Sequence, residues 1–319
     1  MRTQSLGEQT VDLLGRLVRL GCVNDLTADS GGEERAADLL EDFFDGLPVS
    51  TERITPHPGR TSLVVTVEGA DPRSAGTPLT LLGHTDVVPV DTAKWTRDPF
   101  GAQIEDDVMW GRGTVDMLHL TAAMAVVTRE VARRAQDGNP PARSLVFVAA
   151  ADEEARGGLG VPWIGEHRPD ALPWDAALSE MGGAHIRGHR GGDSVVVVVG
   201  EKGAAQRRLH IRGDAGHGSV PLGRTSAVER LAQVSAALSS ARWPTATDEV
   251  WAGFVRAFEF DETTETSLIN GTYEGDYSEF EDLAAFAHAI SHVTVAQTVA
   301  HSGGPINVMP SHATLELDI

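Results

Sequence analysis

The sequence predicts an α/β protein in which helices cover both faces of a mostly parallel β-sheet, followed by a smaller α+β domain. Three observations lead to this prediction. Amphipathic stretches with helical spacing alternate with short, continuously apolar runs, as in parallel sheets flanked by helices. Three of these runs end in side chains that can bind a metal. After Gly200, apolar and polar residues alternate instead, which is typical of half-exposed strands.

The first part of the chain, residues 1–200, is expected to contain the sheet and its helices. Apolar residues at helical spacing predict helices at residues 4–20, 33–46 and 118–135. Apolar or β-branched runs predict strands at residues 62–67, 78–83, 144–151 and 174–179. The last three runs lead into His84, into Asp152 to Glu154, and into Glu180. Because parallel sheets bind ligands beyond the carboxyl ends of their strands, we expect these side chains to converge.

Residues 201–319 are expected to form the second, smaller domain. Alternating or β-rich segments predict strands at residues 206–213, 251–260, 267–273, 293–300 and 313–319. Helical spacing predicts helices at residues 225–241 and 279–290. This order of elements describes a small α+β sandwich.

The charge balance narrows the classes of partner. The chain has 46 acidic and 26 basic residues, a formal net charge of −20. Such a surface repels phosphate backbones, so we expect no nucleic-acid partner. The acid excess is either that of an ordinary acidic surface or includes carboxylates gathered as cation ligands.

The chain has a single cysteine, Cys22, which bears on the cellular compartment and on the residue types that could bind a metal. It cannot form an internal disulfide, which fits a reducing, cytoplasmic environment. A zinc site in this chain would therefore use His, Asp and Glu. No apolar run approaches the 18 or so residues of a membrane span, so we expect no membrane association.

His84 and Asp86 form the first candidate pair. Residues two apart in a strand point the same way, so the two side chains share a face if the strand continues. A carboxylate beside a metal-binding histidine can hold its ring orientation. The alternative is a hydrogen-bonded pair without a metal.

Asp116 closes the segment Gly111-Arg112-Gly113-Thr114-Val115, directly before the predicted helix. Asp is common at helix N-termini, so one interpretation is a helix cap. The other is a carboxylate that bridges two cations.

The run Asp152-Glu153-Glu154 and the separate Glu180 are the remaining acids at strand ends. Three adjacent acids repel one another unless a cation or a shared proton compensates. Because adjacent side chains diverge, one glutamate can bind metal while its neighbour accepts a proton. Solvated turns are the alternative for both segments.

Six segments occur in one order along the chain and together resemble a known family. They are Gly83-His84-Thr85-Asp86-Val87-Val88-Pro89, Trp95 with Asp98-Pro99-Phe100, Gly111-Arg112-Gly113-Thr114-Val115-Asp116-Met117, Glu153-Glu154, Glu180-Met181-Gly182-Gly183, and Gly216-His217-Gly218-Ser219 with Pro221. The pattern is similar to that of the dinuclear zinc hydrolases that include aminoacylases, carboxypeptidases, acetylornithine deacetylases and succinyl-diaminopimelate desuccinylases. The resemblance implies a zinc-exopeptidase-like catalytic domain at residues 1–200 and an inserted lid and dimerisation domain at residues 201–319.

The resemblance also implies a role for each matching residue. The implied metal ligands are His84, Asp116, Glu154 and Glu180, with Asp116 bridging two zinc ions, or Co2+ or Mn2+, per subunit. The implied catalytic residues are Glu153 as general base, Asp86 as the residue that orients His84, and His217 as an oxyanion donor to the partner subunit's site. Asn307 would contact substrate. The implied reaction is hydrolysis of an amide bond in a peptide or N-acyl amino acid by a homodimer.

Two departures from the family pattern leave alternatives open. Leu118 stands where family members carry Lys, and the family's last histidine ligand has no counterpart before the chain stops at Ile319. The chain is therefore expected to be C-terminally truncated. The alternatives to an active hydrolase are an inactive fragment, a non-catalytic metal- or peptide-binding relative, and a structural acidic protein.

Overall fold

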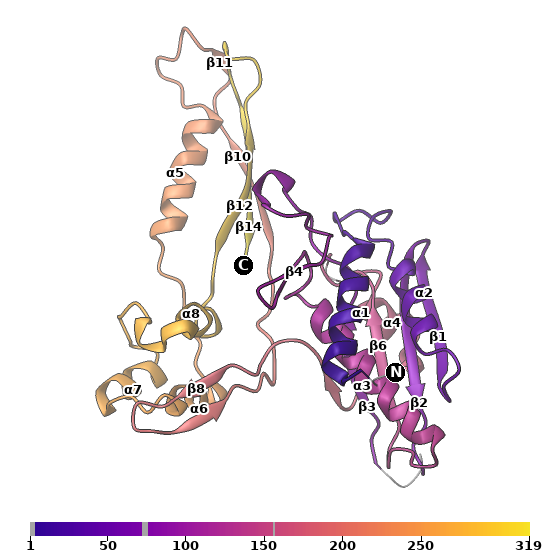
Figure 1. Cartoon of the computed structure of the whole chain (residues 1–319). Helices are drawn as coiled ribbons and strands as arrows, with labels where there is room; N and C mark the ends of the chain where they lie inside the picture. The colour runs from indigo at the N-terminus through magenta and orange to yellow at the C-terminus, as the bar shows by residue number, and fades with distance from the viewer. Residues whose placement is uncertain (1–3, 72–75, 156) are drawn as a thin grey trace. The chain divides into compact units, whose positions relative to one another are not determined.

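The computed structural model describes residues 4–71, 76–155 and 157–319 (Figure 1). The chain divides into two units, Met1–Glu180 and Met181–Ile319. Each unit contains hydrophobic clusters of its own. The boundary predicted from the sequence lies later, after residue 200, and the assignment of a catalytic and a lid domain stays a prediction.

A five-stranded sheet lies at the centre of the first unit, in the order β1-β2-β6-β3-β7. Its strands are β1 Ser50–His57, β2 Arg60–Val67, β3 Leu79–His84, β6 Leu145–Ala150 and β7 Ala177–Leu178. β3 runs parallel to β6 and β7, whereas β2 is antiparallel to β1 and β6. This mixed sheet corrects the prediction of a mostly parallel one. The two-residue turn Pro58-Gly59 joins β1 to β2 and is too short for anything but antiparallel pairing.

Helices cover both faces of this sheet, as predicted. α1 Leu6–Leu20, α2 Glu34–Phe43 and α3 Leu118–Gln136 contribute to one hydrophobic cluster, and α4 Val161–His167 contributes to the other. Along β6, Phe147 and Ala149 belong to the first cluster, and Val146 and Val148 belong to the second. Both faces of β6 are therefore buried, which explains its continuously apolar sequence.

The bounds of α1 follow from its end residues. Ser5 caps the helix and forms a capping box with Glu8. Gly21 ends it in the left-handed conformation, with φ of 57°. Leu13 and Leu17, one turn apart, face the sheet and are at most 3% exposed.

An antiparallel sheet of three strands, β10-β14-β12, lies in the second unit. Its strands are β10 Arg207–Arg212, β12 Ala296–Ser302 and β14 His312–Asp318. Helix α5, Ala227–Ser240, packs on one face of this sheet, and its Leu231 lies against the hydrophobic cluster that contains Ile211 and Leu315. The capping box of Ser226 and Glu229 starts α5.

Two segments predicted as strands are not strands, which corrects the prediction for the second unit. Most of residues 251–260 lies in α6 Glu249–Ala257, and residues 267–273 begin in the last turn of α7 Glu262–Ile269. Asp248 and Asp261 accept hydrogen bonds from the first backbone N–H groups of these helices, as N-caps do. Trp251 and Val255, four residues apart, pack into an aromatic cluster, and this helical spacing overrides the strand propensity of the aromatic residues.

The other elements are short. The predicted helix at 279–290 divides into η3 Ser278–Leu283 and α8 Ala284–Ser291. Two-stranded sheets pair β4 Gln103–Glu105 with β5 Val108–Trp110, β8 His185–Arg187 with β9 Asp193–Val195, and β11 Gly216–His217 with β13 Val308–Met309. Two 3-10 helices, η1 Thr92–Lys94 and η2 Pro169–Ala171, complete the first unit. Across the described residues, no helix combines the length and apolar character that crossing a membrane requires.

Candidate metal centre

The carboxyl ends of three neighbouring parallel strands carry most of the predicted ligands. His84 is the last residue of β3, the middle strand, and pairs with Ala150 at the end of β6. Asp152 to Glu154 follow β6 on one side, and Glu180 follows β7 on the other. The sheet order β6-β3-β7 therefore brings these side chains to one edge.

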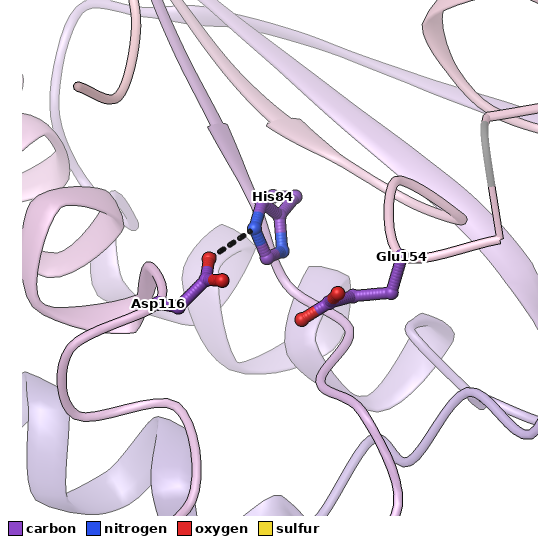
Figure 2. A group of neighbouring side chains, drawn as sticks. All are labelled: His84, Asp116 and Glu154. Carbon is purple, nitrogen blue, oxygen red and sulfur yellow. Dashed lines mark hydrogen bonds and ion pairs between the residues drawn. The ribbon is translucent and has the colours of Figure 1, made fainter. Parts of the chain in front are cut away.

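The ligand atoms around His84 lie within the reach of a common cation. The Nε2 atom of His84 lies 3.2 Å from Asp116 Oδ1, 3.7 Å from Glu153 Oε2 and 3.8 Å from Glu180 Oε2. Two groups of side chains each offer atoms within 4.8 Å of one another: His84 with Asp116 and Glu154, and His84 with Glu153 and Glu180. Figure 2 shows the first group, with Asp116 and Glu154 directed toward the imidazole from separate segments.

The other ring nitrogen of His84 is held by its own strand end. Nδ1 lies 2.9 Å from the backbone oxygen of Asp86 and 3.5 Å from Asp86 Oδ1. A carbonyl oxygen only accepts, so Nδ1 carries the hydrogen and donates it. In the neutral imidazole, Nε2 is then the nitrogen available to a metal. Both the backbone oxygen and the carboxylate of Asp86 therefore lie near Nδ1, and its orienting role stays a prediction.

The carboxylate of Asp86 is fully buried and surrounded by donors. Oδ2 accepts from Asn24 Nδ2 at 2.8 Å and from the Glu154 backbone N at 3.1 Å, and Oδ1 accepts from the Glu153 backbone N at 3.2 Å. Burial raises the pKa of Asp86, but the hydrogen bonds from His84 and Asn24 more than offset this and leave its pKa below the ordinary value. Asp86 is therefore a charged acceptor that joins the ends of β3 and β6.

Asp116 lies close to His84 because a hydrogen bond joins the first turn of α3 to the end of β3. Thr121 Oγ1 donates to the backbone oxygen of His84 at 2.8 Å. A Cβ at Gly83 would lie 2.5 Å from Thr121 Oγ1, so this glycine permits the close approach. Met117, not Asp116, is the N-cap of α3, and the helix has no side-chain cap bond. Of the two interpretations of Asp116, the geometry favours the metal ligand.

The charges of the site favour an additional cation. Burial lowers the pKa of His84, but the hydrogen bond and charge of Asp86, with the charges of Glu153 and Glu180, raise it to about 9. Burial and the charge of Asp116 raise the pKa of Glu154 to about 7. Burial raises the pKa of Glu180. The charge of His84 opposes this rise, and the charges of Glu153 and Asp116 add to it. One imidazole and four carboxylates are donors that suit Zn2+, Co2+ or Mn2+, so the residues fit a divalent metal.

A model of the peptidase family M20/M25/M40 matches residues 80–305 of the chain. The chain belongs to the M20/M25/M40 peptidase family. The resemblance inferred from the sequence motifs is thereby confirmed. The matched range includes His84, Asp116, Glu153, Glu154 and Glu180.

Curated relatives in the M20/M25/M40 family include succinyl-diaminopimelate desuccinylases. One from Cereibacter sphaeroides (strain KD131) is 30% identical over 257 residues, which cover 79% of this chain and 62% of the relative. Another from Shewanella loihica is 30% identical over 174 residues, which cover 54% of this chain and 44% of the relative. The matched region thus spans about three fifths of the first relative's length.

Solved structures with low sequence identity share the fold. An M20 family metallo-carboxypeptidase from Sulfolobus solfataricus has a TM-score of 0.63 at 18% identity, covering 97% of this chain and 70% of that one. Human carnosine dipeptidase 1 has a TM-score of 0.60 at 17% identity, covering 97% of this chain and 69% of that one. The M20-like fold therefore extends over nearly the whole chain.

The remaining predicted residues, His217 and Asn307, lie together in the second unit. β11 pairs with β13, so His217 lies opposite Val308, and the Gly218 N–H donates to the Asn307 backbone oxygen at 2.7 Å. The Ser219 backbone N–H donates to His217 Nδ1 at 3.2 Å. Nδ1 is therefore an acceptor, and in the neutral ring Nε2 carries the hydrogen that could be donated to a ligand.

Three buried residues next to the site were not predicted from the sequence. Asn24, Glu33 and Arg60 are all fully buried and are connected to Asp86 and Asp152 by hydrogen bonds or ion pairs. Each is a single polar residue in an ordinary polar segment, so the sequence contains no signal that distinguishes it from a surface residue.

Proposed function

We propose that this chain is a metal-dependent hydrolase of amide bonds in peptides or N-acyl amino acids. The observation that carries the proposal is the pair of ligand groups that share His84 at the carboxyl edge of the sheet. Membership of the M20/M25/M40 peptidase family supports the same reaction class. Both groups use the same nitrogen of His84, which can bind one cation, so the proposal of two cations per subunit rests on the family resemblance, with zinc as the first choice and Co2+ or Mn2+ as alternatives.

His84, Asp116 and Glu154 would hold one cation, and Glu180 with the bridging Asp116 would hold the second. Bound cations of this kind supply Lewis-acid polarisation of a carbonyl and activation of water. The donor hydrogen on His84 Nδ1 keeps Nε2 directed toward the cation site. The exposed Asp116, with 67% of its side chain accessible, faces the open side where a second cation could enter.

Glu153 is the proposed general base. Its side chain is half exposed, and its Oε2 lies 3.7 Å from His84 Nε2. Asp86 holds the backbone N–H groups of both Glu153 and Glu154, so the two side chains leave a fixed segment in different directions. Glu153 would accept a proton from the attacking water and pass it to the leaving nitrogen.

The substrate and assembly proposals rest on the relatives and on the second unit. The names of the relatives include a desuccinylase, a carboxypeptidase and a dipeptidase, which supports an N-acyl amino acid or a small peptide as substrate. We propose His217 Nε2 as the donor to the oxyanion in the partner subunit's site and Asn307 as a substrate contact, in a cytoplasmic homodimer joined through residues 201–319. An oxyanion donor of this kind contributes about 3–4 kcal/mol to lowering the barrier.

The test begins with the chain stripped of metal by a chelator and reloaded with Zn2+, Co2+ or Mn2+. Hydrolysis is then assayed on a panel of dipeptides, N-acetyl amino acids and N-succinyl amino acids. The metal-loaded chain is expected to hydrolyse members of the panel. Glu153→Gln is expected to lower turnover by about 10²-fold or more while zinc content is retained, because only proton transfer is removed. Glu154→Gln is expected to weaken zinc binding itself.

Glu130→Gln is the matched control, because Glu130 forms an exposed ion pair with Arg134 on α3. It should change neither zinc content nor turnover. Absence of bound metal in the unsubstituted chain would contradict the proposal. Full turnover by Glu153→Gln would reject the role of that residue, and metal binding without hydrolysis of any substrate would favour the non-catalytic relative.

A further inference from the structure

Four buried polar residues lie next to the candidate metal centre, and we call them the clamp: Asn24, Glu33, Arg60 and Asp152. Each is at most 4% exposed. They come from the loop after α1, the start of α2, the first position of β2 and the segment after β6. Burial of charged groups costs free energy unless they are paired, so their arrangement calls for a physical reason.

Arg60, together with the Leu26 backbone N–H that donates to Asn24 Oδ1 at 3.1 Å, fixes which way the Asn24 amide faces. Arg60 Nη1 donates to Glu33 Oε1 at 2.6 Å, and its Nη2 donates to Asn24 Oδ1 at 3.1 Å and to the Thr27 backbone oxygen at 2.6 Å. A guanidinium has donors only, so the oxygen of the Asn24 amide must turn toward it. The NH2 group of Asn24 is thereby directed away from Arg60.

The NH2 group of Asn24 joins two carboxylates. Nδ2 donates to Asp86 Oδ2 at 2.8 Å and to Asp152 Oδ1 at 3.1 Å. Asp86 in turn accepts from the backbone N–H groups of Glu153 and Glu154 and lies beside His84. One amide thus connects the end of β3, which carries His84, with the segment that carries both glutamates.

Glu33 holds the same segment from the other side. Its Oε1, which accepts from Arg60, also accepts from the Asp152 backbone N at 3.1 Å. Asp152 Oδ2 accepts from the Leu159 backbone N at 2.8 Å. Asp152 has a φ of 64°, a left-handed conformation that these bonds stabilise immediately before the two glutamates. A side chain at Gly31 would overlap Arg60 Nη1, so the backbone closes directly over the clamp.

We propose that Arg60, acting through Asn24, is a positioning residue of the candidate metal centre. It holds Asp86 and the Glu153–Glu154 segment in place beside His84, where the candidate metal ligands converge. The inference rests on the proposed function, because it requires a divalent cation at His84, Asp116 and Glu154. None of the clamp residues belongs to the two candidate ligand groups of His84. Their effect is on the orientation of the residues in those groups.

A purely structural clamp makes a different prediction from a positioning clamp. Lys at position 60 keeps a positive charge beside Glu33, but its single flexible ammonium cannot also hold Asn24 Oδ1 in a fixed plane. Ala at position 24 leaves the Arg60–Glu33 pair intact but removes the amide that joins Arg60 and the Leu26 N–H to Asp86 and Asp152. If the clamp positions the ligands, both substitutions weaken metal binding in protein that remains folded.

The experiment measures Zn2+ binding to the metal-free 319-residue chain by calorimetry, with circular dichroism to verify folding at the binding temperature. Asn24→Ala is expected to bind Zn2+ about 10–100-fold more weakly, the usual effect of losing a residue that orients metal ligands. Arg60→Lys is expected to weaken binding in the same direction. The double variant should be no weaker than the weaker single variant, because both break one chain of bonds.

Arg53→Lys is the matched control. Arg53 on β1 makes comparable bonds to carboxylates, at 2.7 Å to Asp38 Oδ1 and 2.9 Å to Glu41 Oε2, away from the site. It should leave the Zn2+ affinity unchanged even if the melting temperature falls. An equal loss of affinity in Arg53→Lys would overturn the inference.

The outcomes separate this inference from the proposed function. Zn2+ binding that is lost in His84→Ala but unchanged in folded Asn24→Ala and Arg60→Lys overturns the positioning role alone. Absence of Zn2+ binding in the unsubstituted chain overturns the proposed function and this inference with it. If Arg60→Lys does not fold, Asn24→Ala decides the question, because it preserves the buried ion pair.

Discussion

Asp86 and Asp116 both approach His84, but their surroundings are opposite. Asp86 is fully buried and accepts hydrogen bonds from Asn24 and from the backbone of Glu153 and Glu154. The side chain of Asp116 is 67% exposed, and its neighbours include His84 and Glu180. One side of the imidazole is thus rigid and supplied with donors, whereas the other is open and lined with acids.

The pKa values of Asp86 on the buried side and of Glu154 on the side lined with acids differ accordingly. Hydrogen bonds offset the effect of burial on Asp86 and keep its pKa low, whereas burial and the charge of Asp116 raise the pKa of Glu154 to about 7. Distance to His84 therefore does not distinguish a structural carboxylate from a ligand. Burial and the hydrogen bonds that Asp86 accepts do, because an exposed carboxylate such as that of Asp116 remains open to water or to a cation.

The largest expected effect is on the buried side. Asp86→Ala is expected to lower the free energy of unfolding of the metal-free chain by about 3–5 kcal/mol, because it leaves buried donors without their charged acceptor. Asp116→Ala should change it by no more than about 0.5 kcal/mol, as is usual for exposed side chains. Urea unfolding in the presence of a chelator measures both. Similar losses in the two variants would break the comparison.

The second effect is a pH dependence that belongs to His84. Its pKa of about 9 in the folded chain lies above the ordinary value of 6.5, so folding favours the protonated ring. This stabilisation is complete below pH 6.5 and is lost as the pH rises to 9, on the order of 2–3 kcal/mol in the metal-free chain. Urea unfolding at the two pH values should show a smaller loss in His84→Gln than in the unsubstituted chain.

The matched control for this pH dependence is His167→Gln, at an exposed position on α4. It should retain the full loss between pH 6.5 and pH 9. Zn2+ competes with the proton on His84, so its stabilising effect should be larger at pH 9 than at pH 6.5. Equal losses in His84→Gln and the unsubstituted chain would show that another group is responsible.

The smallest expected effect sharpens the comparison on the open side. Gly83→Ala places a Cβ against Thr121 and should move the start of α3, with Asp116, away from His84. Such overpacking costs about 1–3 kcal/mol. The Zn2+ affinity should also fall when measured by calorimetry. Gly46→Ala, where a Cβ meets no atom within 4 Å but φ is 75°, controls for glycine replacement at a surface turn.

The candidate site was largely predictable because its geometry follows from strand ends. His84, the acids after β6 and Glu180 follow apolar runs, and parallel neighbours necessarily bring such ends together. The strand order of the sheet was not predictable in the same way. β1 is a partly polar segment without a continuous apolar run, so the antiparallel β1–β2 pair was missed and the sheet was expected to be mostly parallel.

In the second unit, too, the local sequence pattern did not predict the secondary structure correctly. The aromatic residues of α6 suggested a strand, but Asp248 starts a helix there and the aromatic cluster buries one helical face. Local propensity was weaker than capping combined with packing.

The sequence by itself determined the residue types of the candidate metal centre and their association with strand ends, because motif order and apolar runs are properties of the chain. Only the tertiary structure decided that Asn24, Glu33 and Arg60 are buried beside it. A polar residue has the same sequence pattern whether it is solvated or enclosed, and its burial is set by which distant segments fold over it. The separation of the enclosed Asp86 from the open Asp116 has the same origin.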